Sequence, residues 1–377
     1  MSTSNYSPGL EGVVSNTTSI SYLDVELGQI LLRGYDLIEL SQKLTYPEVA
    51  YTIIYGALPK DHETATFVRQ LSEQYQIPND IYDFFNIMPK NTNLMDAMRS
   101  GISMLAGYED PKFLTDNSHD ANLAKGLRLL AKTPSIAANA YRSLTGQPFV
   151  SPDPQLGFAE NLLFMIQGSS PDPLSLESFD RVLTCYSEHE MANSTFAARV
   201  ISSTFSDIYG GMVGAIASLK GPLHGGANEA AMYMLLDILE KGGEQNTEPY
   251  LSEKMAQGIR IMGFGHRVYM RKYDPRAYYL REYIPRLVDK KPEGPELLAI
   301  YRRVEEVMLR DRGLYPNADY PIALILYLLD VPIPLYTPIF FAARVAGLIA
   351  HVMEQHENNR LFRPRVNYEG ERGLTVR

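Results

Sequence analysis

The apolar residues recur with the period of an α-helix along nearly the whole chain, and this pattern most limits the folds available to it. Between residues 200 and 239 they fall three to four positions apart, at Val200, Ile201, Phe205, Ile208, Met212, Leu235, Leu236, Ile238 and Leu239. Alternation with the period of a β-strand is scarce. Prolines mark plausible helix boundaries, at Pro47, Pro59, Pro78, Pro89 and Pro222. The pattern predicts an all-α protein of long helices joined by short turns.

One predicted helix, from Ala197 to Lys220, is rich in small residues and includes Gly210, Gly211 and Gly214. Glycine destabilises a helix interior by about 1 kcal/mol relative to alanine, so several together suggest that another backbone approaches closely. The segment fits either a buried core helix or a helix at a subunit interface.

Length and composition exclude several classes of protein. With 377 residues, 45% of them hydrophobic, the chain can bury a large core and is expected to form two domains in close contact. A net charge of −9 argues against nucleic acid as a partner, so an anionic ligand must meet a local cluster of Arg or His.

Cysteine usage and hydropathy predict a cytoplasmic protein that does not enter a membrane. The single cysteine, Cys185, can form neither an internal disulfide nor a cysteine-based zinc site. No signal peptide is visible at the N-terminus. The apolar run from Ile322 to Leu329 is too short to span a bilayer, and the run from Pro338 to Met353 is interrupted by Arg344 and His351.

Three of the seven histidines stand in unusual surroundings: His189 between two glutamates, and His224 and His266 among glycines. A histidine among glycines has few packing neighbours and lies on backbone that a ligand can approach closely. The alternative is a structural histidine that satisfies a turn or a buried carbonyl. The contexts of His62, His119 and His356 are polar and predict solvated side chains. No metal site is expected, since no His-Glu-x-x-His pair occurs and His351 and His356 lie five positions apart.

Two glycine-rich segments resemble phosphate loops but lack the required residues. Gly221 to Gly226 has P-loop spacing, yet Ala227 and Asn228 follow where Lys and Ser or Thr are needed. The segment from Gly263 to Gly265 lacks the third glycine and the preceding strand of a dinucleotide fingerprint. The free N–H groups of the helix predicted after Gly226 could still receive an anion or an oxyanion.

Asp319 and Arg344 each allow a structural and a functional interpretation. Asp319 precedes a proline-started apolar helix, where an N-cap is common and contributes about 1 kcal/mol. Arg344 lies within an apolar helical face, where burial is costly unless an internal carboxylate or a bound anion pairs with it. Taken together, two histidines, a carboxylate and several arginines predict an acid–base site for a small anion. That chemistry fits proton abstraction beside a carbonyl, followed by attack on a second carbonyl.

The chain resembles the citrate synthase family in motifs spread over nearly its whole length. These motifs are Gly9-Leu-Glu-Gly12, Arg33-Gly-Tyr35, Tyr55-Gly-Ala-Leu-Pro59, Gly221-Pro-Leu-His-Gly-Gly-Ala-Asn-Glu229, Met262-Gly-Phe-Gly-His-Arg-Val-Tyr269, Tyr273-Asp-Pro-Arg276 and Arg363-Pro-Arg365. The resemblance implies an all-α homodimer with an active site in the cleft between two domains. The large domain would comprise residues 1–222 and 324–377, and the small domain residues 223–323.

The resemblance also assigns roles. His224 would hydrogen-bond the thioester carbonyl of acetyl-CoA, Asp319 would remove its methyl proton, and His266 would polarise the keto oxygen of oxaloacetate. Oxaloacetate would be held by His189, Arg276, Arg344 and, from the neighbouring subunit, Arg363. The coenzyme A would meet the loop of Met262, Gly263, Phe264 and Gly265, with Arg271 or Lys272 near its phosphates. Acetyl-CoA is then a substrate, and no cofactor is implied.

One departure from the family pattern leaves alternatives open. Where relatives usually carry Phe or Ala, then Tyr or His, then Ser-Gly after the catalytic Asp, this chain has Tyr320-Pro-Ile-Ala323. A 2-methylcitrate synthase using propionyl-CoA is one alternative, since one methylene in an apolar pocket discriminates by only about 1–3 kcal/mol. The other is a catalytically impaired homologue that serves as a CoA- or dicarboxylate-binding module.

Overall fold

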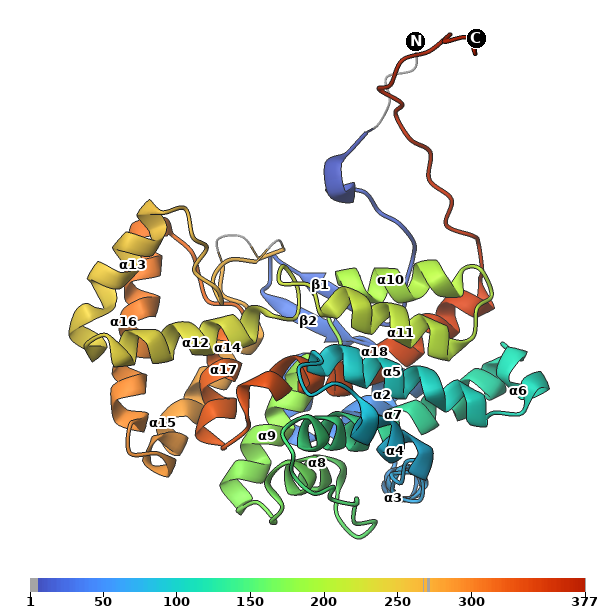
Figure 1. The fold of residues 1–377 in the computed structure, drawn as a ribbon, viewed down its shortest axis with the longest axis horizontal. Coiled ribbons are helices and arrows are strands. Elements are labelled where there is room, and N and C mark those ends of the chain that lie inside the picture. The colour runs from blue at the N-terminus through green and yellow to red at the C-terminus, as the bar shows by residue number, and fades with distance from the viewer. Residues whose placement is uncertain (1–5, 267, 270–271, 377) are drawn as a thin grey trace.

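A computed structural model describes residues 6–266, 268–269 and 272–376. Over these residues the chain folds into eighteen α-helices, short 3-10 turns and one small sheet (Figure 1). The 3-10 turns are Pro8–Leu10, Ala106–Tyr108, Gly243–Asn246, Arg281–Tyr283, Val288–Lys290 and Ile333–Leu335. The predicted all-α class is confirmed.

The larger group of helices surrounds one long buried helix, α18 (Tyr336–Glu357). The group further comprises α1 (Leu37–Lys43), α2 (Tyr46–Tyr55), α3 (Asp61–Ser72), α4 (Asn79–Ile87), α5 (Leu94–Leu105), α6 (Pro111–Thr115), α7 (His119–Leu144), α8 (Phe158–Gln167), α9 (Pro173–Tyr186), α10 (Asn193–Ser202) and α11 (Ile208–Leu219). Helix α18 packs against α2, α7, α9, α10 and α11. With the turn before it, α18 is long and apolar enough to cross a membrane, but 89% of its most apolar window is buried inside the protein. It is therefore a core helix.

The smaller group lies on the left of Figure 1. It comprises α12 (Ala227–Glu240), α13 (Thr247–Ala256), α14 (Pro275–Leu280), α15 (Ile284–Leu287), α16 (Gly294–Arg312) and α17 (Asp319–Leu328). Contacts of α17 with α9 and of α12 with α18 join the two groups. The exact domain boundaries stay a prediction.

Helix boundaries follow local chemistry. The five prolines noted in the sequence all lie at helix ends or between helices, as predicted, because proline lacks the N–H that a helix interior needs. Helices α1, α5, α6, α7, α9, α11 and α14 begin behind an Asp, Asn or Ser whose side chain accepts hydrogen bonds from the first free N–H groups.

The single helix predicted from Ala197 to Lys220 is wrong. The chain breaks into α10 and α11, with Phe205 in the left-handed backbone region (φ 61°) and Asp207 capping α11. The glycines do mark a close approach, but its partner is the preceding helix of the same chain. A Cβ on Gly214 would overlap Ile201, and one on Gly211 would press against Ser202.

A three-stranded antiparallel sheet near the N-terminus was not predicted. Its strands are β1 (Ser21–Asp24), β2 (Gln29–Leu32) and β3 (Tyr35–Asp36), with Ser21 opposite Leu32 and Leu32 opposite Tyr35. The sheet forms a separate small core with α1 and Tyr269, which brings it close to the segment that carries His266.

Candidate active site

The predicted catalytic residues line one groove of about 1080 Å³, formed by elements of the smaller helix group together with the turn between α11 and α12 and Glu11 near the N-terminus. Among the lining residues are His224, His266, Asp319 and the segment from Met262 to Gly265. Residues nearly a hundred positions apart in sequence therefore face the same space.

The loop carrying His266 is hydrogen-bonded to the loop that leads into Asp319. Phe264 pairs with Pro316 in an antiparallel bridge, and Asn317 N–H donates to the Gly263 carbonyl at 2.9 Å. Gly263 must be glycine for two reasons: its φ is +85°, and a Cβ would lie only 2.9 Å from Tyr320 Cβ. This pairing fixes the distance between the loops that carry His266 and Asp319.

His224 lies in the turn between α11 and α12. Its Nε2 atom is 2.9 Å from Ser194 Oγ and 3.3 Å from the Ser194 backbone nitrogen. Because a backbone N–H can only donate, Nε2 is assigned as the acceptor, which leaves the proton of the neutral ring on Nδ1. Burial lowers the pKa of His224 to about 4, with a smaller contribution from Arg344. The ring is therefore a neutral hydrogen-bond donor at physiological pH.

His266 is held in the opposite tautomer. The backbone N–H of Val268 donates to His266 Nδ1 at 3.0 Å, so the ring proton is assigned to Nε2. Burial lowers the pKa of His266 to about 4, although Asp274 opposes this shift. The centre of the His266 ring lies 5.2 Å from that of the buried His189 ring. The Nε2 atom of His189 shares a hydrogen bond of 2.8 Å with the Tyr269 hydroxyl.

Asp319 begins α17, but its side chain does not cap that helix, so the N-cap interpretation is not supported. Asn317 takes that role by accepting from the Asp319 N–H at 3.1 Å. The Asp319 carboxylate instead accepts a hydrogen bond from the Tyr186 hydroxyl at 2.8 Å. Burial raises the pKa of Asp319 to about 6, against the opposing effect of the Tyr186 hydrogen bond. The carboxylate is a stronger base than an exposed one.

Arg276 and Arg344 are buried near His189 and supply positive charge there. Burial lowers the pKa of His189 well below its usual value, and the two arginines and His266 add to that shift. Arg276 forms a two-point ion pair with Asp274, whose oxygens accept from Nε at 3.0 Å and from Nη2 at 2.7 Å. The ligand atoms of His189, His266 and Asp274 all lie within 4.8 Å of one another, a spacing that would suit a metal ion. Both Asp274 oxygens already pair with Arg276, so this carboxylate is not free to ligate a cation.

Arg344 is buried in α18, and burial lowers its pKa to about 10. Its Nε donates to the Tyr186 carbonyl at 2.6 Å, and its guanidinium lies 4.8 Å from the centre of the Phe340 ring. Within the described part of the chain, Nη1 is buried and has no hydrogen-bond partner, and no direct ion pair of this arginine is found. Of the two interpretations, this geometry favours a clamp for a bound anion.

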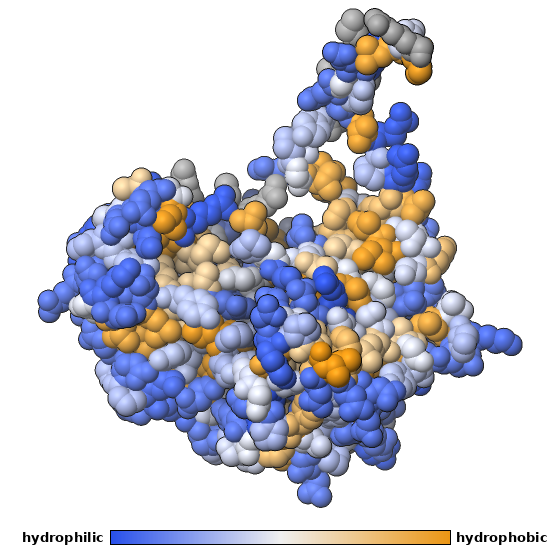
Figure 2. All heavy atoms as spheres, in the orientation of Figure 1, coloured by the Kyte–Doolittle hydropathy of each residue, from blue (hydrophilic) through white to orange (hydrophobic). Residues whose placement is uncertain are grey.

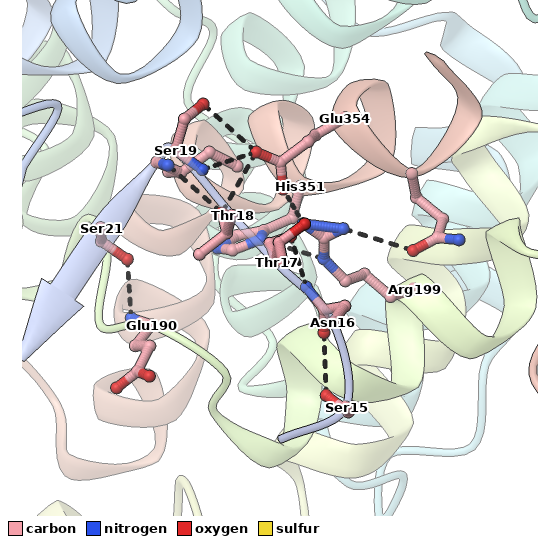
Figure 3. Close-up of polar contacts among 12 residues, drawn as sticks. Ser15, Asn16, Thr17, Thr18, Ser19, Ser21, Glu190, Arg199, His351 and Glu354 are labelled. Carbon is pink, nitrogen blue, oxygen red and sulfur yellow. Dashed lines mark hydrogen bonds and ion pairs between the residues drawn. The ribbon is translucent and has the colours of Figure 1, made fainter. Parts of the chain in front are cut away.

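A polar network joins the N-terminal segment and β1 to α10, α18 and the loop after α9; Figure 3 shows part of it, including Ser21 with Glu190 and Arg199 with Glu354. Arg199 of α10 pairs with Glu354 and donates to His351 Nδ1 at 3.2 Å, and His351 Nε2 lies 3.1 Å from Glu188. Ser21 of β1 donates to Glu188 at 2.8 Å. His351 is therefore part of the support of the site rather than a metal ligand.

Some predicted residues are not brought to the groove. Lys272 donates to the backbone carbonyls of Val25 and Glu26 in the β1–β2 turn, and Arg271 lies outside the described residues. Arg260 and Arg312 line the groove instead, although no motif singled them out. The prediction that His356 is solvated is wrong, since it is buried beside Asn122, whereas His62 and His119 are exposed.

Arg363 lies in the C-terminal segment, which extends away from the body in Figure 1. Arg363 is exposed, and among the described residues its Nη1 donates to the neighbouring carbonyl of Pro364, at 3.0 Å. Within one subunit Arg363 does not reach the groove.

Tyr186 is a site residue that sequence reasoning missed. It ends α9 and is buried. Its hydroxyl donates to Asp319, its backbone carbonyl accepts from Arg344, and its ring stacks on Phe340 with 4.1 Å between the ring centres. The only sequence signal was its position three residues before His189.

The chain is similar in sequence and in fold to known proteins of one family. The family described as "Citrate synthase, C-terminal domain" matches residues 9–365. The chain is 48% identical to a citrate/2-methylcitrate synthase of Bacillus subtilis, over 98% of both chains. It is 45% identical to a citrate synthase of Heyndrickxia coagulans, over 100% of this chain and 99% of the relative. A solved ternary complex of carboxymethyl coenzyme A and oxaloacetate with citrate synthase from Thermoplasma acidophilum superposes with a TM-score of 0.92, at 30% identity and 98% coverage of both chains.

The chain therefore belongs to the citrate synthase family, as its motifs indicated. It is an acyltransferase with the all-α fold of that family.

Proposed function

We propose that the protein condenses acetyl-CoA with oxaloacetate and hydrolyses the resulting citryl-CoA to citrate and CoA. The observation that carries this proposal is the groove in which two neutral histidines of opposite tautomer face a carboxyl whose pKa is raised to about 6. Such a set can withdraw one proton and stabilise two carbonyl oxygens at the same time.

Asp319 takes a methyl proton from acetyl-CoA while His224 donates its Nδ1 proton to the thioester oxygen. The proton is only weakly acidic, so the charge that develops on oxygen must be stabilised as it forms. A preorganised donor contributes about 3–4 kcal/mol to such a step. The enol carbon then attacks the keto carbon of oxaloacetate. As the bond forms, the thioester carbonyl is restored and returns its proton to His224 Nδ1, while the keto oxygen receives the Nε2 proton of His266. Water then cleaves the thioester to the acid and the free thiol of CoA, and the proton held by Asp319 returns to His266.

The charged residues around the groove match the two substrates. Arg344 with its unpartnered Nη1, Arg276 and His189 are buried close to His266 and Asp319, where they would grip and orient a dicarboxylate. Arg260 and Arg312 lie in the same groove beside the Met262–Gly265 loop, where the phosphates of CoA would be met. The proposed reaction consists of proton transfers, carbon–carbon bond formation and hydrolysis, so it requires no cofactor.

We further propose that the active form is a homodimer in which Arg363 enters the partner's groove. Apolar side chains on both terminal segments are exposed in the single chain, including Val14 (87%) and Val366 (85%). Figure 2 shows apolar atoms along these segments and on the body near their base. Such surface is normally covered by another chain, and a second copy would also supply the arginine that each groove lacks.

Propionyl-CoA is the alternative acyl donor, because the Bacillus subtilis relative is named for both activities. CoA release should be measured with acetyl-CoA and with propionyl-CoA, each in the presence of oxaloacetate. Faster turnover of acetyl-CoA supports the proposal, and faster turnover of propionyl-CoA favours 2-methylcitrate synthesis. Binding of both substrates without CoA release would leave only the binding-module alternative.

A further inference from the structure

Tyr186 stands at the centre of a directed chain of hydrogen bonds that ends on Asp319. Asn228, buried in α12, has its Nδ2 atom 3.2 Å from the Tyr186 hydroxyl, and that hydroxyl lies 2.8 Å from Asp319 Oδ1. These hydrogen bonds join three helices. Helix α12 begins just after His224, α9 ends just before His189, and α17 begins at Asp319.

The direction of this chain follows from elementary donor and acceptor rules. The backbone N–H of Glu229 donates to Asn228 Oδ1 at 2.7 Å, so the amide is oriented with its NH₂ group towards Tyr186. An amide N–H can only donate, so the Tyr186 oxygen accepts from Asn228 and its own proton is directed to Asp319. Oδ1 of the base is thereby occupied, and the groove-facing carboxylate has Oδ2 left to receive a proton.

The Tyr186 hydroxyl is itself fixed in place. Its ring is buried and stacked on Phe340 with an interplanar angle of 12°. Its backbone carbonyl accepts from Arg344 Nε at 2.6 Å. One residue thus holds both the carboxylate base and the arginine proposed to grip the dicarboxylate.

We propose that Tyr186 is a positioning residue that orients Asp319 and keeps it ionised near neutral pH, with Asn228 orienting the Tyr186 hydroxyl. The inference rests on the proposed condensation reaction. A donor to the ionised form favours ionisation, and burial opposes it. Asp319 must be ionised to accept the methyl proton, so loss of the donor lowers the fraction of active enzyme on the acidic side of the pH profile.

The test is the variant Tyr186→Phe, which keeps the stacked ring and removes only the hydroxyl. The acidic limb of the kcat profile, near pH 6 in the wild type, should move up by about one pH unit. At pH 8 kcat should fall by about 10- to 100-fold through misorientation of the base, with KM for oxaloacetate changed by less than about threefold.

Tyr320→Phe is the matched control, since Tyr320 is equally buried and adjacent to Asp319, but its hydroxyl donates to the Tyr301 carbonyl. Its acidic limb should stay in place. An unmoved limb in Tyr186→Phe, or an equal shift in both variants, overturns the inference. If Tyr186→Phe does not fold, Asn228→Ala tests the same inference. A smaller upward shift of its acidic limb supports the role of Tyr186, and an unchanged acidic limb overturns it.

These outcomes separate the inference from the proposed function. If the wild type releases no CoA from either thioester, the proposed function fails and the inference fails with it. If the wild type turns over and the limb does not move, the proposed function stands and only the role of Tyr186 is overturned.

Discussion

Replacing Asp319 with Asn should lower kcat at least about 100-fold and, at the same time, stabilise the folded protein. Asn keeps the size of the side chain and can still accept a hydrogen bond from Tyr186, but it cannot act as a base. General bases contribute about 10²- to 10⁴-fold to rates, so kcat should fall by that amount. A residue that served only the fold would show no such loss.

The gain in stability follows from the raised pKa of Asp319. The unfolded chain ionises this carboxyl near pH 3.8 and the folded protein near pH 6. The folded state therefore binds the proton more tightly, and its stability falls as the pH rises through this window. Each tenfold difference in proton affinity corresponds to about 1.4 kcal/mol, so the penalty at pH 8 is at most about 3 kcal/mol. The Asn side chain is neutral at every pH and does not incur this penalty. Below about pH 4 the two proteins should have nearly the same free energy of unfolding.

The assay combines denaturant unfolding at pH 4 and pH 8 with CoA release at pH 8. Asp83→Asn, a substitution at an exposed carboxylate in α4, is the control and should alter neither quantity. Activity within tenfold of wild type in Asp319→Asn would refute the assignment of the base. A stability difference that does not change between pH 4 and pH 8 would refute the argument from burial.

Three further predictions concern the substrates and the dimer. Mixing the inactive variants Asp319→Ala and Arg363→Ala should restore about a quarter of wild-type activity, because random exchange makes half the dimers mixed and each mixed dimer has one intact site. If subunit exchange is confirmed and no activity returns, Arg363 does not act in the partner's site. Arg344→Leu should raise KM for oxaloacetate by about 100-fold or more while the fold is retained, as judged by circular dichroism, and an unchanged KM would show that Arg344 does not hold the substrate. Saturating oxaloacetate should reduce hydrogen exchange around the groove and tighten acetyl-CoA binding, and unchanged exchange and affinity would argue against a closing cleft.

The two histidines that the structure brings to the groove stood out because their local sequence is chemically unusual. His224 and His266 stand among glycines, and the positive φ of Gly263 shows that the glycines are needed by the backbone of the loop. The all-α class was predictable as well, because apolar periodicity is set by the burial of each helix face.

Features that depend on packing between distant segments could not be predicted. Tyr186 lies among apolar positions of α9 and looks like a core aromatic, and only the fold brings its hydroxyl to Asp319. The strands of the small sheet have two to four residues, too few for an alternating pattern to stand out. The break between α10 and α11 did have a local signal, since Asp207 is a good N-cap, but the apolar periodicity runs on across it.

Lys272 shows that a residue close to a site motif in sequence need not lie in the site. It follows His266 by six residues, yet its ammonium group binds carbonyls of the β1–β2 turn. Arg260 reaches the groove from the loop after α13, and Arg312 from the end of α16, and no spacing rule connects Arg312 to the His266 motif.

The most direct test of the account is to follow the methyl carbon of the thioester. The purified protein should be incubated with oxaloacetate and with acetyl-CoA that carries carbon-13 in its methyl group, and the products should be identified by mass spectrometry. The groove of His224, His266 and Asp319 predicts labelled citrate and an equal amount of free CoA. Labelled acetate beside unreacted oxaloacetate, or no conversion at all by the folded protein, would contradict it.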